Sequence, residues 1–186
     1  NHDASALARG ALEFPRELPG FLVVFIVTAL MFLADTRIAA LSALLVGIAL
    51  WGQGFLSPDL AMVVVWMVVW STGAHLYMAI TPSIGIRLAR AGQEGRRLGQ
   101  IGVLESLGAL VGLMTVYWGA SRWDFSFATI FGLAGVFAVL AAASLFIIKP
   151  QPLQNPPRRP VINRKYWLFY MLNLVFGARK QIFLTF

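Results

Sequence analysis

The chain contains no cysteine among its 186 residues, which excludes a disulfide framework, thiolate catalysis and cysteine-ligated metal sites. It has two histidines, His2 and His75, which are too few and too far apart for a zinc site. Charge is scarce as well, because charged residues make up 12% of the chain, and a soluble domain carries about twice that share. The sequence holds no Walker-type phosphate loop, so we do not expect ATP to drive this chain directly. We also expect no metal and no other cofactor.

Apolar residues, by contrast, make up 59% of the chain and gather in six blocks. Each block is roughly 17–27 residues long, and about 20 residues of helix span the hydrocarbon of a bilayer. Buried helices of a soluble protein would each need a polar face, and the blocks show none. The sequence therefore predicts an all-α, polytopic transmembrane helical bundle in a lipid bilayer. The blocks are Leu18–Ala34, Ile38–Leu56, Leu60–Ile86, Ile101–Ala120, Phe125–Ile148 and Tyr166–Phe186.

Basic residues are distributed unevenly over the connectors between the blocks. Connectors one, three and five lie on one side and hold ten basic residues, whereas the opposite side holds three, Arg9, Arg16 and Arg122. The positive-inside rule places the ten-residue side in the cytoplasm. The net charge of +7 is thus a topology signal, and we expect no nucleic-acid partner. The ten are Arg37, Arg87, Arg90, Arg96, Arg97, Lys149, Arg158, Arg159, Arg164 and Lys165.

The connector 149–165 carries five of the nine prolines and cannot form one regular helix. It predicts a cytoplasmic linker between a bundle in residues 1–148 and a second bundle that starts in residues 166–186. The chain has no initiator methionine and stops inside an apolar run, so we expect an internal fragment that is truncated at both ends.

Three stretches resemble the major facilitator superfamily of transporters: LADTR at Leu33–Arg37, GRRLGQIGVLESLGALVG at Gly95–Gly112, and FGARKQIFLTF at the end of the chain. The resemblance maps the chain onto the second to seventh helices of a bacterial family member, so that residues 1–148 lack the first helix. It implies a secondary transporter of the inner membrane, not an enzyme, in which two bundles move a small solute by alternating access. It also implies that Asp35 and Arg37 belong to a cytoplasmic latch. The alternative for Asp35 is a solvated turn residue.

Glu105 is four residues into its block and shares a helix face with Gly102, Ala109 and Gly112. Small residues favour a close helix–helix contact, and Gly108 and Gly112 form a GxxxG pair. The carboxylate is therefore expected to face protein, where an arginine could reach it: Arg37, Arg96 or Arg97. A structural ion pair is favoured over a proton carrier.

His75 lies past the middle of its predicted span, and Ser71 precedes it by one helical turn on the same face. A lone histidine at this depth is either a hydrogen-bonded packing residue or part of a cavity that binds substrate or titrates near neutral pH.

Arg179 and Lys180 lie roughly 20 Å into the last block, too deep to reach the cytoplasm by snorkelling. Either they reach the outer interface, or they line a polar cavity with Asn173 and Gln181. Such a cavity would suit an anionic or carboxylate-bearing solute, with a proton or other ion as coupling partner. A membrane-embedded enzyme and a non-transporting sensor or scaffold are the alternative functions.

Overall fold

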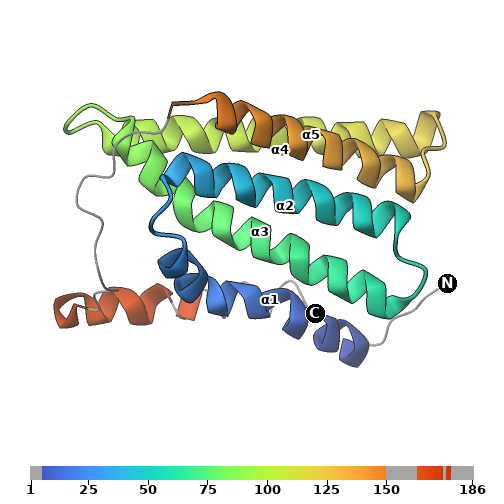
Figure 1. Cartoon of the computed structure of the whole chain (residues 1–186), viewed down its shortest axis with the longest axis horizontal. Helices are drawn as coiled ribbons and strands as arrows, with labels where there is room; N and C mark the ends of the chain where they lie inside the picture. The colour runs from blue at the N-terminus through green and yellow to red at the C-terminus, as the bar shows by residue number, and fades with distance from the viewer. Residues whose placement is uncertain (1–5, 150–162, 174, 177–186) are drawn as a thin grey trace.

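The computed structural model describes residues 6–149, 163–173 and 175–176 (Figure 1). This part of the chain is helical and contains no strand, which confirms the all-α prediction. The long helices lie side by side with their axes along the length of the molecule. Residues 167–173 and 175–176 are also helical. The elements are α1 (Ala6–Ala29), α2 (Asp35–Phe55), α3 (Leu60–Arg87), α4 (Glu94–Arg122), α5 (Phe127–Ile147) and a short 3₁₀ turn, η1 (Arg164–Tyr166).

Among the described residues, four helices are long and apolar enough to cross a membrane: α2, α3, α4 and α5. Helix α1 is not one of these candidate membrane spans, because charged residues occupy its first half. A helical membrane protein is therefore the class that the fold fits.

Small residues bring the central helices together. Helix α2 lies between α3 and α5, and α1 packs on α3 (Figure 1). A Cβ atom at Gly73 of α3 would lie 2.7 Å from the carbonyl oxygen of Ser42, so the backbones of α2 and α3 approach closely there. Gly47 of α2 and Gly135 of α5 meet in the same way, each facing the carbonyl of the other. Such contacts replace the hydrophobic driving force that a bilayer cannot supply.

The first helix differs from the predicted span 18–34. It begins at Ala6 and ends at Ala29, and residues 30–34 then turn towards α2. The predicted connector between the first two blocks consists of Asp35, Thr36 and Arg37. In the structure these residues form the first helical turn of α2. An acidic residue is favourable there because the helix dipole is positive at its N-terminus. We call the level of Asp35 and Arg87 the Asp35 end of the bundle, and the opposite level the Asp59 end.

At the Asp59 end, side chains cap the starts of two helices. The carboxylate of Asp59 accepts a 2.8 Å hydrogen bond from the backbone N–H of Met62 and so starts α3. The hydroxyl of Ser126 accepts one from the N–H of Thr129 and starts α5. Both are ordinary N-cap residues, and they fix where the helices begin.

Helix α4 lies at the edge of the described bundle, and Gly119 is its one buried residue. The close contact predicted at Gly102, Gly108 and Gly112 is not formed within the described part of the chain, because a Cβ atom at any of them would meet nothing within 4 Å. Instead, an apolar groove of about 580 Å³ runs between α4 and α5.

Candidate functional site

A group of polar side chains lies between α1 and α3, half-way along α3. His75 is about 22 Å by helical rise from Leu60 at one end of this helix and about 18 Å from Arg87 at the other. In a helix that spans a bilayer, this position is near the centre of the hydrocarbon. Polar groups are costly at that depth, so each one present needs a partner.

Ser71 and His75 are in contact, as their one-turn spacing predicted. The ring nitrogen Nδ1 of His75 lies 3.0 Å from the Ser71 hydroxyl and 2.9 Å from the Ser71 carbonyl oxygen. The hydroxyl of Ser71 donates to the backbone carbonyl of Arg16 on α1. Ser71 is completely buried, so this contact joins α1 to α3.

Three charged residues of α1 complete the group. Oε2 of Glu17 lies 3.6 Å from Nε2 of His75, and Oε1 of Glu17 lies 3.0 Å from Nη2 of Arg16. Arg16 also forms an ion pair with Glu13, one turn earlier. The His75 and Glu17 side chains are 25% and 44% exposed, so the group is open on one side. We call Glu13, Arg16, Glu17, Ser71 and His75 the α1–α3 polar cluster.

Gly20 makes room for the imidazole ring. A Cβ atom at this position would lie 2.6 Å from Nε2 and 2.7 Å from Cδ2 of His75. The ring therefore packs directly against the backbone of α1, one turn beyond Glu17. A glycine is what allows this close approach.

Glu13, Arg16 and Glu17 precede the predicted span 18–34, which puts them outside the membrane in the prediction. The structure places them within α1, beside the middle of α3. A signal was present, since residues 13, 16 and 17 are spaced three and four apart and so share one helix face. This spacing did not predict a helix, because Pro15 and Pro19 lie in the same stretch and prolines are unfavourable in a helix interior.

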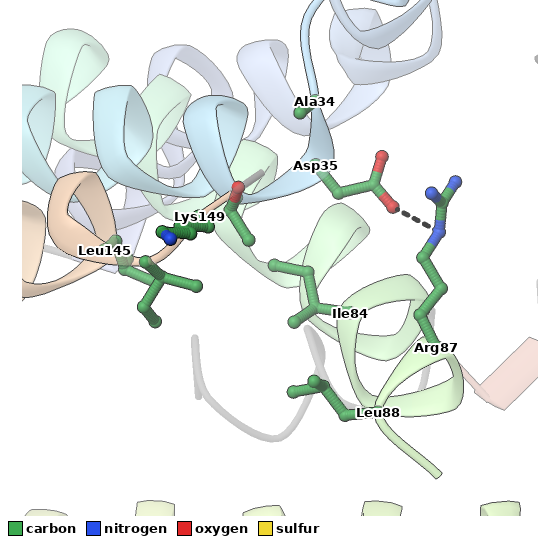
Figure 2. Close-up of a pocket in the computed structure, with 9 residues that line it drawn as sticks. Ala34, Asp35, Ile84, Arg87, Leu88, Leu145 and Lys149 are labelled. Carbon is green, nitrogen blue, oxygen red and sulfur yellow. Dashed lines mark ion pairs between the residues drawn. The ribbon is translucent and has the colours of Figure 1, made fainter. Parts of the chain in front are cut away.

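A second polar contact lies at the Asp35 end (Figure 2). Oδ2 of Asp35 lies 3.1 Å from Nε of Arg87 and accepts a 2.6 Å hydrogen bond from the Ser83 hydroxyl. The carboxylate thus ties the start of α2 to the end of α3. Next to it is a small cavity of about 70 Å³, which Ile84, Leu145 and Lys149 help to line.

Arg37, at the same end, binds α5. Its Nη1 donates a 2.6 Å hydrogen bond to the carbonyl oxygen of Phe146, and its guanidinium carbon lies 5.4 Å from the centre of the Phe146 ring. Arg37 and Asp35 therefore do not pair with each other but connect α2 to two different helices. Thr36, between them, has a buried hydroxyl with no hydrogen-bond partner among the described residues.

Within the described residues, the other predicted site residues are not brought together. Glu105 is exposed on α4, and within the described part of the chain none of the three candidate arginines forms an ion pair with it. Arg96 and Arg97 are exposed at the start of α4, where Arg97 donates to Gln100 over 3.4 Å. Asn173 donates to the carbonyl of Phe169 in its own helical turn. Arg179, Lys180 and Gln181 lie outside the described residues.

The α1–α3 polar cluster combines a guanidinium, carboxylates and an imidazole at one level of an apolar bundle. Such a set can bind an ionic solute and can take up and release a proton. No protein-family model, curated protein or solved structure matches the chain.

Proposed function

We propose that the protein is a secondary active transporter that moves a small solute across a membrane by alternating access of two helical bundles. The observation that carries this proposal is the α1–α3 polar cluster, held half-way along α3 in a bundle of apolar helices. An ionisable side chain at the centre of a bilayer marks a substrate or ion pathway by default, because its desolvation is costly. A scaffold or sensor would give these residues no such role.

The contacts at the Asp35 end support a bundle that moves as one body. Asp35 joins α2 to α3 through Arg87, and Arg37 joins α2 to α5 through Phe146. Trp51, further along α2, donates a 3.0 Å hydrogen bond to the carbonyl of Gly132 on α5. Alternating access by rocking of two bundles requires such rigid units.

The proposed orientation follows the basic residues of the connectors. The Asp35 end carries Arg87, Arg90, Arg96 and Arg97, so we propose that it faces the cytoplasm. The resemblance to the major facilitator superfamily implies that the membrane is the bacterial inner membrane. The basic residues of the linker 149–165 favour the same side for it.

The proposed class of solute depends on which basic side chains can bind it. Arg16 is already shared by Glu13 and Glu17, so it is not the obvious anion-binding group. Arg179 and Lys180 carry that part of the proposal, with Gln181 next to them in the sequence and Asn173 seven residues before Lys180. Paired cations favour an anionic or carboxylate-bearing solute.

Uptake by the protein from the complete gene, reconstituted in lipid vesicles, tests this function. A panel of small anionic, neutral and cationic solutes is offered with and without a pH gradient. We expect protein-dependent uptake of an anionic member, loss of this uptake in His75→Ala, and normal uptake in Asp124→Asn, a change in the turn before α5. If folded protein moves no member of the panel in either direction, the proposal is wrong.

A further inference from the structure

We infer that Glu17 and His75 form one proton-binding site half-way along α3, in which Nε2 of His75 takes up a proton opposite Oε2 of Glu17. This inference rests on the proposed transport function and names its coupling ion as the proton.

The hydrogen bonds around Ser71 fix the tautomer of His75. The hydroxyl of Ser71 has one proton and donates it to the carbonyl of Arg16. Nδ1 of His75 therefore faces only acceptors, the Ser71 hydroxyl oxygen at 3.0 Å and the Ser71 carbonyl oxygen at 2.9 Å. Nδ1 must carry a proton, since two acceptors cannot bond without one between them. In the neutral ring, Nε2 is then the unprotonated nitrogen.

Nε2 faces a carboxylate oxygen, so without a further proton two lone pairs oppose each other. The 3.6 Å between Nε2 and Oε2 is an ion-pair separation, somewhat longer than an N–H···O hydrogen bond. One added proton turns this repulsion into an attraction between an imidazolium and a carboxylate. The pair is thus one proton short when His75 is neutral and Glu17 is ionised.

Arg16 determines which partner carries the proton. Its Nε and Nη2 donate to Oε1 of Glu17 over 3.2 and 3.0 Å. A carboxylate that accepts two charge-assisted hydrogen bonds is stabilised as the anion. The proton therefore resides on Nε2 of His75, and Glu17 serves as its counter-ion.

The charges that face His75 come from α1. Helix α2 has its charged residues, Asp35 and Arg37, in its first turn at the Asp35 end. Helix α4 reaches α3 near Gly85, through Leu98 and Ile101, which is also at that end. Among the described residues, the titratable or charged neighbours of the ring are thus Glu17, Arg16 and Glu13.

Proton binding would alter how tightly α1 holds α3. A protonated His75 attracts Glu17 across the helix interface, and a neutral His75 repels it. The side chains are 25% and 44% exposed, which leaves the proton a way in and out. A proton that favours one arrangement of two helices over another shifts the population between them, as coupling requires.

Nuclear magnetic resonance of nitrogen-labelled histidine in the complete protein, in lipid nanodiscs, tests the tautomer directly. The His75 signal is assigned by its absence from the His75→Asn variant. At high pH we expect the neutral ring with its proton on Nδ1. A neutral ring protonated on Nε2 would overturn the inference.

Glu17→Gln tests the pairing, with Asp124→Asn as a matched loss of one carboxylate far from the site. An amide does not stabilise the imidazolium as a carboxylate does. At one fixed pH, the doubly protonated ring of His75 should therefore be less populated in Glu17→Gln than in the wild type. Its population should stay unchanged in Asp124→Asn. An equal population in wild type and Glu17→Gln refutes the shared site.

Transport measurements separate this inference from the proposed function. Loss of pH-driven accumulation in Glu17→Gln, with this accumulation retained in Asp124→Asn, supports proton coupling at this pair. If uptake by the wild type does not depend on the pH gradient, proton coupling is wrong, whereas the proposed transport function is still supported.

Discussion

Nε of Arg87 lies 3.1 Å from Oδ2 of Asp35, and this same oxygen accepts a 2.6 Å hydrogen bond from the hydroxyl of Ser83. One carboxylate therefore joins the first turn of α2 to the last two turns of α3. The Asp35 side chain is only 12% exposed, so its charge depends on these donors more than on water. Arg87 is 34% exposed and can turn to solvent when its partner is lost.

We expect Asp35→Asn to lower the free energy of unfolding by about 1–2 kcal/mol, because a charge-assisted bond is lost while Arg87 regains solvent. Thermal unfolding of the complete protein in detergent measures this. The control is Arg90→Gln, which removes an exposed cation from the turn that follows α3. An equal change in both variants would show that the Asp35 contact adds nothing beyond general charge.

Gly73 and Gly108 should respond in opposite ways to alanine. A Cβ atom at Gly73 would lie 2.7 Å from the Ser42 carbonyl oxygen, and a backbone atom cannot move aside cheaply. Gly73→Ala should therefore destabilise the protein by about 1–3 kcal/mol. A Cβ atom at Gly108 meets nothing within 4 Å, so Gly108→Ala should be neutral or stabilising by up to about 1 kcal/mol.

Unfolding in detergent compares the two alanine variants directly. A loss at Gly108 as large as that at Gly73 would mean that Gly108 contacts a helix outside the described residues. A stable Gly73→Ala protein would contradict the close approach of α2 and α3.

The positions of the apolar helices could be predicted from the sequence, because the thickness of a bilayer sets the length and hydropathy of a membrane-spanning segment. Helices α2, α3, α4 and α5 cover the predicted blocks 38–56, 60–86, 101–120 and 125–148, with ends that differ by a few residues except at the start of α4. Helix α4 begins earlier, at Glu94, since hydropathy cannot detect the polar turns of a helix that leave the membrane. The truncation and the family resemblance stay predictions.

The sequence could not tell which small residues form helix contacts. It singled out Gly108 and Gly112, whereas the described contacts use Gly47, Gly73 and Gly135. Spacing gives the face on which a glycine lies, but only the arrangement of helices decides what lies opposite. For the same reason His75 and Ser71 were found from spacing, but their partner Glu17 was not, since it comes from another helix.

Labelling of single cysteines tests the proposed topology, and the sequence has no native cysteine in this region to remove. We expect cysteines at positions 90 and 158 to react from the cytoplasm, and one at position 122 from the outside. Membrane-impermeant maleimide on intact cells and inverted vesicles distinguishes the two sides. Positions 122 and 158 reacting from the same side would contradict the arrangement.

Arg179 and Lys180 provide the sharpest test of the solute class. At the depth of roughly 20 Å predicted from the sequence, these adjacent cations would repel each other, so both would need a water-filled cavity or an anion. In the described bundle Asp35 is already paired with Arg87, and Glu17 with Arg16 and His75. The solute itself is then a natural counter-charge for the pair.

Arg179→Ala and Lys180→Ala should therefore each abolish binding of an anionic solute, whereas the protein still inserts in the membrane. Adjacent helix positions point about 100° apart, so the two residues should differ in how far a conservative exchange restores binding. Arg179→Lys loses bidentate geometry, whereas Lys180→Arg keeps the charge and adds donors. Solute binding by tryptophan fluorescence, with insertion checked by membrane fractionation, gives the readout. Normal binding by both alanine variants would show that the pair only anchors its helix at the outer interface.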